Sequence, residues 1–499
     1  MTRLILMTIS CLWWIAAPYQ LQISNAADSE SSEIFQVETA EQVGELLKTN
    51  ALAPGDTIVW LCGNYQDIEL NVEGIDGLQN QPITLRAESP GAVILEGETQ
   101  FSIGAQHWVI SGFHFRGRED STNAYNTFQF RSKGGTAAKH VRLTDCAFTD
   151  LHTSETTSKW VLLFGQNNTI DHCHFSGKNS RGALVTVELA YLTQSDVAGH
   201  TIFRNYFGSV APSEGNDNET IRIGSSADQN KSGGCSVVEN CFYSCDGENE
   251  IISNKSSYNE YLRNTFRRCN GALVLRHGHH ARVEGNFFFA DGAENAGGIR
   301  ISDSHHVIMN NYLQDLSGTG WNASLSVIGG SELSGGQSNG YQRVEDLSVA
   351  HNSILNCRSS VLFNDAKGER PPQGIFANNL IVSSNGPLID LKLPATEITW
   401  VGNLMHGPST NSQLIAISGD PELTESNGLL RPSSRGTAAD AALDCGIEVR
   451  LDIDGQLRPE SGADVGADEF SGESGEVVFA PLMPADVGVS FPIQTQKER

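Results

Sequence analysis

Short stretches of alternating apolar and polar residues recur along most of the chain. Each leads to an Asn or Cys that is followed two positions later by a large apolar residue. The instances are Cys146/Phe148, Cys173/Phe175, Asn205/Phe207, Asn240/Phe242, Asn264/Phe266, Asn286/Phe288, Asn311/Leu313, Asn352/Ile354, Asn379/Ile381 and Asn403/Met405. Alternation with a period of two predicts strands rather than helices. Most steps between instances span 22 to 27 residues, and three longer steps span 32, 35 and 41.

A repeat of this length predicts an all-β solenoid with about three short strands in each coil. The expected fold is a right-handed parallel β-helix, because crossovers between parallel strands are right-handed in nearly all proteins. The large apolar residues are expected to stack into an interior ladder. We expect the Asn residues to lie at a bend, because Asn tolerates left-handed backbone and its side chain can bond a neighbouring coil.

Both ends of the solenoid show a change of pattern. Thr39 to Leu47 has helical periodicity and predicts a short helix that caps the first coil. The ladder ends near Asn403, and the less regular sequence up to Phe470 is assigned to the same domain, residues 27–470. Residues 471–499 are expected to form a C-terminal tail that is a loose strand or disordered.

Residues 1–26 are expected to be a secretory signal peptide. They combine Arg3, an apolar segment from Leu4 to Ala17 and the small-residue site Ser24-Asn25-Ala26. No later apolar run is long enough to span a bilayer, so the mature protein is expected to be secreted or periplasmic. Most cysteines are expected to be buried thiols, while the pairs Cys241–Cys245 and Cys245–Cys269 stay open.

The charge of the chain excludes some partners. There are 33 Lys and Arg against 59 Asp and Glu, a formal charge of −26, which argues against nucleic acid and anionic membranes. Residues 255–300 run against this trend. They hold Lys255, Arg263, Arg267, Arg268, Arg276, Arg282 and Arg300 against Glu260, Glu284, Asp291 and Glu294. We expect this local basic region to attract an anionic polymer, with Arg267 and Arg268 at the groove edge or in solvent.

Reactive side chains gather in the same region. Glu248 and Glu250 are two positions apart, so on a strand they leave the same face and can bind one hard cation through oxygen. Lys255 and Arg276 are 21 residues apart, close to one coil, so we expect them side by side. Arg300 follows after 24 residues and is expected to extend the row. Carboxylates near a lysine are usually a solvated surface network, and the coil register favours a catalytic interpretation.

Several motifs resemble polysaccharide lyase family six, the group of alginate lyases and chondroitinase B. They are Gly215-Asn-Asp-Asn-Glu-Thr-Ile-Arg-Ile-Gly224, Glu248-x-Glu250-x-Ile252-x-x-Lys255-Ser256, Leu275-Arg276-His277-Gly278 and Asp464-Val-Gly-Ala-Asp-Glu-Phe470. The resemblance covers residues 34–470. It implies a right-handed parallel β-helix that cleaves uronate polysaccharides by β-elimination with the help of Ca²⁺.

The resemblance also assigns roles to residues of this chain. Lys255 matches the general base and Arg276 the general acid, while Asn216, Glu248 and Glu250 match calcium ligands. Asn218 competes with Asn216 for the ligand role, because Asp-Asn follows Asn216 where the family commonly has Gly-Gly, and Glu219 can also approach the metal. His277 and Arg300 are expected to contact the carbohydrate.

Elimination at a uronate requires a base for the C5 proton and positive charge near the carboxylate. Lys255 can be that base only as a neutral amine, which neighbouring cations favour. Alginate with mannuronate-containing bonds is the expected substrate. The alternatives are a dermatan sulfate lyase like chondroitinase B, a non-catalytic carbohydrate-binding β-helix, or a glycosidase, for which no facing carboxylate pair is evident.

Two further features of the sequence lead to expectations. The longer steps, at residues 207–240 and 313–352, are expected to form loops that decide substrate preference, and the oligomeric state stays open. His140, His200, His280 and His306 each precede a ladder residue by five or six positions. They are interpreted as recurring bend residues rather than metal ligands.

Overall fold

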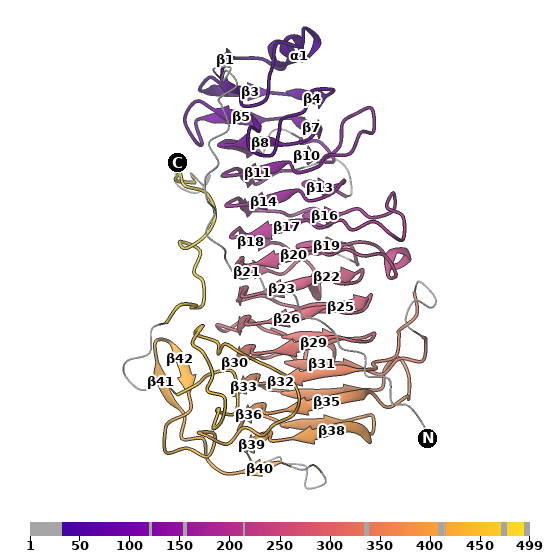
Figure 1. Cartoon of the computed structure of the whole chain (residues 1–499), viewed down its shortest axis with the longest axis vertical. Coiled ribbons are helices and arrows are strands. Elements are labelled where there is room, and N and C mark those ends of the chain that lie inside the picture. The colour runs from indigo at the N-terminus through magenta and orange to yellow at the C-terminus, as the bar shows by residue number, and fades with distance from the viewer. Residues whose placement is uncertain are drawn as a thin grey trace, which may run out of the picture.

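Three long parallel sheets form the body of the molecule (Figure 1). The computed structural model describes residues 32–118, 122–152, 157–212, 215–333, 339–407, 414, 416–470 and 477–493. The sheets contain 14, 12 and 14 strands, and successive coils add one strand to each sheet. The predicted parallel β-helix is therefore confirmed. The expected signal peptide, residues 1–26, lies outside the described residues.

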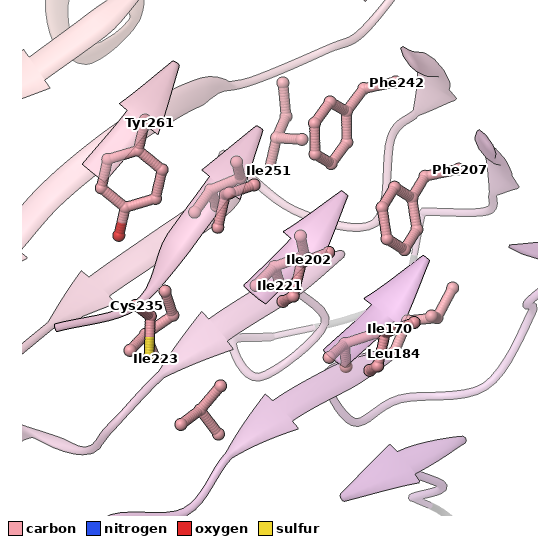
Figure 2. Close-up of a cluster of buried hydrophobic side chains, with 14 of the residues drawn as sticks. Ile170, Leu184, Ile202, Phe207, Ile221, Ile223, Cys235, Phe242, Ile251 and Tyr261 are labelled. Carbon is pink, nitrogen blue, oxygen red and sulfur yellow. The ribbon is translucent and has the colours of Figure 1, made fainter. Parts of the chain in front are cut away.

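The first sheet begins at the N-terminal end of the described chain. Its strands are β1 (Ile34–Val37), β2 (Thr57–Trp60), β5 (Ile83–Ala87), β8 (Trp108–Ser111), β11 (Arg142–Thr144), β14 (Thr169–Asp171), β17 (Thr201–Phe203), β20 (Ser236–Val238), β23 (Glu260–Leu262), β26 (Arg282–Glu284), β29 (Val307–Met309), β32 (Leu347–Ala350), β35 (Gln373–Ala377) and β38 (Glu397–Val401). Ile170, Ile202 and Tyr261 point from it into the core (Figure 2).

The second sheet carries the face on which the reactive residues lie. Its strands are β4 (Glu69–Glu73), β7 (Gln100–Gly104), β10 (Phe128–Gln129), β13 (Val161–Leu163), β16 (Val185–Val187), β19 (Ile221–Ile223), β22 (Glu250–Lys255), β25 (Ala272–His277), β28 (Ile299–Ile301), β31 (Leu325–Ile328), β34 (Val361–Asn364) and β37 (Ile389–Leu391). Ile221 pairs with Ile252, which pairs with Leu273, and all three are buried.

The third sheet contains the predicted interior ladder. Its strands are β3 (Gly63–Gln66), β6 (Val93–Glu96), β9 (Phe113–Arg116), β12 (Ala147–Thr149), β15 (His174–Ser176), β18 (Tyr206–Val210), β21 (Cys241–Cys245), β24 (Thr265–Arg267), β27 (Phe287–Phe289), β30 (Tyr312–Gln314), β33 (Ser353–Leu355), β36 (Leu380–Val382), β39 (Leu404–His406) and β40 (Ile417–Ser418). A stack runs through Phe115, Phe148, Phe175, Phe207, Phe242, Phe266 and Phe288, with successive ring centroids 4.5 to 5.1 Å apart.

A buried ladder of Asn side chains occupies the bend between the first and third sheets. Its members are Asn205, Asn240, Asn264, Asn286, Asn311, Asn352, Asn379 and Asn403. In each step a backbone N–H donates to the Oδ1 atom of the Asn one coil further on, over 2.9 to 3.1 Å. The ladder thus satisfies backbone donors that would otherwise be buried without a partner.

The expected left-handed backbone of these Asn residues is wrong. The left-handed residue is the one before each Asn, as at Arg204 (φ 51°), Glu239 (φ 52°) and Arg263 (φ 52°). The preceding residue turns the chain, and this turn directs the Asn side chain inward, where its amide can bond the coils on both sides. The bend role is therefore correct, but left-handed tolerance is not the reason for Asn.

The histidines singled out in the sequence do lie at bends. His140 and His280 have left-handed backbone, with φ of 54° and 58°. His200 and His306 are buried, and their Nδ1 atoms accept backbone N–H bonds from Asn168 and Ala281. Burial lowers the pKa of each of these two histidines to about 3, so both are neutral at ordinary pH.

The N-terminal end of the solenoid is covered by α1 (Ala40–Lys48), as predicted (Figure 1). Thr39 is its N-cap: the Thr39 Oγ1 atom accepts the N–H of Gln42, and the Gln42 side chain accepts the N–H of Thr39. Val43 is fully buried, and α1 packs against β4. This arrangement covers the core at the exposed first coil.

The C-terminal part of the chain covers the outside of the third sheet instead of adding coils. It contains an antiparallel hairpin of β41 (Thr424–Ser426) and β42 (Leu429–Arg431). A second core forms between the two layers, from Phe287, Tyr312, Leu355 and Leu380 on one side and Leu429, Ile453, Val465 and Ala467 on the other. The domain assigned to 27–470 therefore consists of a solenoid and a cover.

Residues 477–493 then run back along the third sheet toward the N-terminal coils (Figure 1). The N–H of Leu482 donates to Thr265 Oγ1 (2.8 Å), and the N–H of Gly488 donates to the Arg204 carbonyl (3.0 Å). The N–H of Ser490 donates to Asp145 Oδ1 (2.6 Å). The described part of the expected tail is therefore an extended segment held by hydrogen bonds and without strand pairing.

Two other features complete the fold. Short 3-10 helices occur at η1 (Ser226–Asp228) and η2 (Gly320–Asn322), both inside the longer repeat steps. All nine cysteines in the described part of the chain are free, so neither open disulfide pairing forms there. Among the described residues, the α-helix falls short of the length and apolar character that a membrane crossing requires.

The Asn ladder leads to a prediction about stability. Asn264→Ala removes an acceptor for Asn240 and a donor to the Val237 carbonyl, all of them buried. We expect a loss of about 2–4 kcal/mol in the free energy of unfolding, measured by urea denaturation. Asn80→Ala, at an exposed position, is the control. Equal urea midpoints for the two variants would contradict a stabilising ladder.

Candidate active site

A groove of about 790 Å³ lies on the outer face of the second sheet. Its lining residues are Pro212, Gly215, Asn216, Asp217, Glu219, Arg222, Ser226, Asp246, Gly247, Glu248, Asn249, Glu250, Lys255, Asn270, Arg276, Arg300, Trp321, Asn339, Tyr341 and Lys367. The two longer repeat steps, 207–240 and 313–352, contribute its walls. The loops expected to influence substrate preference therefore do line the groove.

Lys255 and Arg276 lie next to each other on the groove floor. β22 pairs with β25, and an irregularity after Asn254 brings Lys255 opposite His277, the neighbour of Arg276. Both Lys255 and Arg276 line the groove. The coil-length argument thus predicted their proximity correctly. Because of the irregularity, Arg276 lies one position away from the directly paired residues Lys255 and His277.

Lys255 contacts a buried carboxylate. Its Nζ atom lies 3.2 Å from Glu219 Oε1, and the side chain of Glu219 is only 2% exposed. The second oxygen of this carboxylate, Oε2, is buried and has no hydrogen-bond partner among the described residues. Glu219 therefore orients the amine of Lys255 and keeps one acceptor available.

Arg300 is in the groove but not in the predicted row. The core pairs Leu273–Ile299 and Leu275–Ile301 set the register, so Arg300 pairs with Val274, two residues before Arg276. Counting from the Asn ladder missed this offset, because the chain between ladder and strand differs in length from coil to coil. Arg300 Nη1 lies 3.4 Å from Glu250 Oε1, and burial lowers the pKa of Arg300.

His277 lies behind the groove surface. It is fully buried, it is not among the lining residues, and its Nδ1 atom lies 2.9 Å from Oε1 of Gln342. Burial is the main cause that lowers the pKa of His277 to about 4, with the charge of Arg276 adding to the effect. His277 is therefore placed to support Arg276 from behind, since Arg276 Nη1 lies 3.4 Å from its Nδ1 atom. Its contact with the substrate stays a prediction.

Three carboxylates form the acidic end of the groove. The pKa of Glu248 is raised to about 8, mainly by burial and also by the negative charges of Glu219 and Glu250. The backbone N–H of Asn218 donates to Glu248 Oε1 over 3.3 Å, which partly offsets this effect. The three carboxylates repel one another in a partly buried place, and a bound cation would relieve that repulsion.

The amide donors differ in how well they suit a cation. Asn218 is 1% exposed, its Nδ2 donates to the Ala211 carbonyl, and its Oδ1 is buried without a partner among the described residues. Asn216 is exposed at the rim, and among the described residues its hydrogen bond is the one that its backbone carbonyl accepts from Arg181 Nε. The orphaned buried oxygen and the backbone contact with Glu248 favour Asn218, although only Asn216 of the two lines the groove.

The donor set fits Ca²⁺ in chemistry, since it offers carboxylate and amide oxygens. As placed, the described residues contain no group of three or more His, Cys, Asp or Glu side chains arranged to hold a metal. Glu219 is engaged with Lys255 and Glu250 with Arg300, which accounts for the lack of convergence. A cation site here would need these carboxylates to turn toward Glu248.

Aromatic and basic residues form the other end of the groove, and most of them were missed in the sequence. The guanidinium carbon of Arg276 lies 3.8 Å from the centre of the Tyr341 ring, and Arg276 Nη1 donates to the Gly340 carbonyl over 3.0 Å. The rings of Tyr341 and Trp321 are 5.9 Å apart, with Lys367 near both. The long 41-residue step was the only sequence signal for this wall.

The basic stretch 255–300 does not form one basic patch, contrary to expectation. Only Lys255, Arg276 and Arg300 of its seven basic residues line the groove. Arg267 is on β24 of the third sheet, where its guanidinium contacts Asp291 and Phe289, and Arg268 follows that strand. A coil turns through three faces, so neighbours in sequence separate in space.

Comparisons with known proteins agree with this fold and groove. The sequence model of the chondroitinase B family matches residues 37–415. The PL6 family alginate lyase AlyGC has a TM-score of 0.76 and 28% identity, and the match covers 93% of this chain and 59% of that one. This chain thus spans about three fifths of the length of AlyGC. A comparison with curated proteins found no match.

Two other solved structures extend the comparison. A mannuronic acid specific family 6 lyase from human gut microbiota has a TM-score of 0.67 and 28% identity, over 76% of this chain and 87% of that one. A PL6 polysaccharide lyase from Pseudopedobacter saltans has a TM-score of 0.65 and 22% identity, over 92% and 100%. The latter shows the fold alone.

The family model covers more than half of the chain and therefore defines its class, the polysaccharide lyases of this family. Within that class, the chain belongs to the chondroitinase B family, which is polysaccharide lyase family six. The family resemblance seen in the sequence is confirmed.

Proposed function

We propose that this protein is a secreted, calcium-dependent lyase that cleaves alginate at mannuronate-containing bonds by β-elimination. The observation that carries the proposal is one groove that joins Lys255, Arg276 and the three acidic residues Glu219, Glu248 and Glu250. Two solved structures at 28% identity support the substrate, because one is an alginate lyase and the other is mannuronic acid specific. The signal-like residues 1–26 support secretion.

Lys255 is the base of the proposed reaction. Its neutral amine takes the C5 proton of a uronate, and the electrons of the C5–H bond form the C4=C5 double bond while the C4–O4 bond breaks. Glu219 holds the amine in the groove through its 3.2 Å contact. An unsaturated uronate is left on one product. The leaving oxygen departs with the electrons of the C4–O4 bond, takes a proton from water and becomes the hydroxyl of the new reducing end on the other product.

Arg276 stabilises the oxygen that leaves. Arginine remains charged in proteins, so its contribution is electrostatic rather than the release of its own proton. The ring of Tyr341 and the carbonyl of Gly340 hold the guanidinium in place. A guanidinium that is already oriented needs little rearrangement when negative charge develops on the leaving oxygen.

Glu248, Glu250 and Asn218 are the residues that would hold Ca²⁺, with Asn216 the alternative amide. When bound, the ion supplies positive charge to the substrate carboxylate, which makes the C5 proton more acidic. Glu219 lies beside this set and also contacts Lys255, so it links the cation end of the groove to the base.

The first prediction from this proposal concerns the substrate. Purified protein incubated with polymannuronate, polyguluronate and dermatan sulfate should release an ultraviolet-absorbing unsaturated product fastest from polymannuronate. Product from dermatan sulfate alone would replace alginate as the substrate. Absence of product from all three, with Ca²⁺ present, would favour a carbohydrate-binding protein over an enzyme.

The second prediction concerns the two catalytic residues. Lys255→Ala and Arg276→Ala should each lower turnover by about 100-fold or more, because each removes a group that acts in the transition state. Melting temperatures should change little, since both side chains face the groove. Lys392→Ala and Arg282→Ala, at surface ion pairs outside the groove, are matched controls. Near-normal turnover of either groove variant would refute its role.

The third prediction separates the two candidate amide ligands. Chelation should abolish activity, and added Ca²⁺ should restore it and raise the melting temperature of the chelated protein. Asn218→Ala should weaken Ca²⁺ binding by at least about 10-fold, measured by calorimetry, while Asn216→Ala should leave it nearly unchanged. The reverse order would return the role to Asn216, and full activity after exhaustive chelation would remove Ca²⁺ from the proposal.

A further inference from the structure

The charged groups of the groove are divided into compensated and uncompensated sets. Its lining has five basic residues, Arg222, Lys255, Arg276, Arg300 and Lys367, and five acidic ones, Asp217, Glu219, Asp246, Glu248 and Glu250. Three of the basic residues contact carboxylates: Arg222 contacts Asp217, Lys255 contacts Glu219, and Arg300 contacts Glu250. Within the described residues, no carboxylate lies within 4.0 Å of the charged nitrogens of Arg276 or Lys367.

These two uncompensated cations flank the same aromatic ring. The guanidinium carbon of Arg276 lies 3.8 Å from the centre of the Tyr341 ring, and Lys367 Nζ lies 5.3 Å from it. Lys367 Nζ is also 5.7 Å from the centre of the Trp321 ring. The capacity of the groove to bind a further anion therefore lies at its aromatic end.

The chemistry of this end suits a sugar acid. Two half-buried rings offer apolar faces for the C–H groups of a pyranose, and the exposed ammonium of Lys367 offers a donor for a carboxylate. The rings come from the 313–352 step, and Lys367 comes from the loop after β34, one coil further on. Two coils thus contribute to one small recess.

The position of Arg276 orients this recess relative to the bond that breaks. On the proposed mechanism, on which this inference rests, Arg276 stabilises the leaving oxygen, and it also contacts Tyr341 directly. The sugar that carries the leaving oxygen therefore lies against Tyr341 and Trp321. The uronate that loses its proton lies on the other side, toward Lys255.

We infer that Trp321, Tyr341 and Lys367 form a subsite that binds the leaving sugar and requires that sugar to be a uronate. Lys367 is then a specificity-determining residue that pairs with the carboxylate of that sugar. A polymer with a carboxylate on every residue meets this requirement at each bond. A polymer in which uronates alternate with amino sugars places no carboxylate there.

The test uses partly carboxyl-reduced polymannuronate, in which mannose is interspersed among mannuronate. Elimination always needs a uronate on the side of the new double bond, but the sugar at the new reducing end reports the subsite alone. Mass spectrometry should find the wild-type protein leaving mannuronate there about 10-fold more often than the composition of the polymer predicts.

Variants of one residue then isolate the charge. Lys367→Met should lose this preference, so that mannose appears at new reducing ends in proportion to its abundance, and its KM for polymannuronate should rise about 10-fold with a smaller change in kcat. Lys367→Arg should retain the preference. Lys392→Met, at an exposed ion pair with Asp390, should match the wild type in both measurements.

The possible failures are distinguishable. If the wild-type protein cleaves no polyuronate, the proposed function is wrong. If it cleaves polymannuronate but accepts mannose at the new reducing end as readily as mannuronate, the function stands and the subsite inference is overturned. A preference that persists in Lys367→Met would assign it to another residue and would also overturn the inference.

Discussion

The register between successive coils is the constraint on which the groove depends. Side chains on a strand alternate between core and surface, so a slip of one residue would turn Lys255 toward the core and the buried Ile252 toward the surface. Strand pairing in three sheets resists such a slip, and the Asn ladder adds a buried bond at each bend between the first and third sheets from Asn205 to Asn403. Catalytic geometry in this fold is therefore a consequence of core packing, because residues that contact no substrate determine which side chains meet.

The solenoid could be predicted from the sequence because its repeat carries a signal in every coil. The Asn and Phe positions recur at nearly regular steps, and the structure stacks them as expected. The same regularity brought Lys255 and Arg276 together. Arg300 was displaced by two positions, because the linker between strand and bend varies in length, and no residue type in the sequence marks that variation.

The aromatic end of the groove could not be predicted from the sequence, for a different reason. Trp321 and Tyr341 lie in a long insertion without internal repeat, and Lys367 comes from the following coil. Their proximity depends on how the insertion folds over the sheet, for which periodicity carries no information. Likewise, the basic residues between 255 and 300 looked like a cluster in sequence, whereas the coils that contain them distribute them over three faces.

The groove also explains how a strongly acidic protein can accept an acidic polymer. Net charge acts over distances that salt screens, whereas the groove presents local partners at contact distance. Basic groups that are paired with acids hold the floor in shape, and the two that are not paired leave room for the polymer. Attraction is thus confined to one end, which gives a bound chain a direction.

The returning segment 477–493 alters the mechanics of the solenoid. Coils of a simple solenoid contact only their neighbours, so the stack can fray from either end one unit at a time. This segment joins the C-terminal cover to coils far upstream, through Thr265, Arg204 and Asp145. Loosening one of these coils therefore strains bonds made by the others. The segment therefore couples the unfolding of coils that are not neighbours, and it does so along the third sheet, whereas the groove lies on the second.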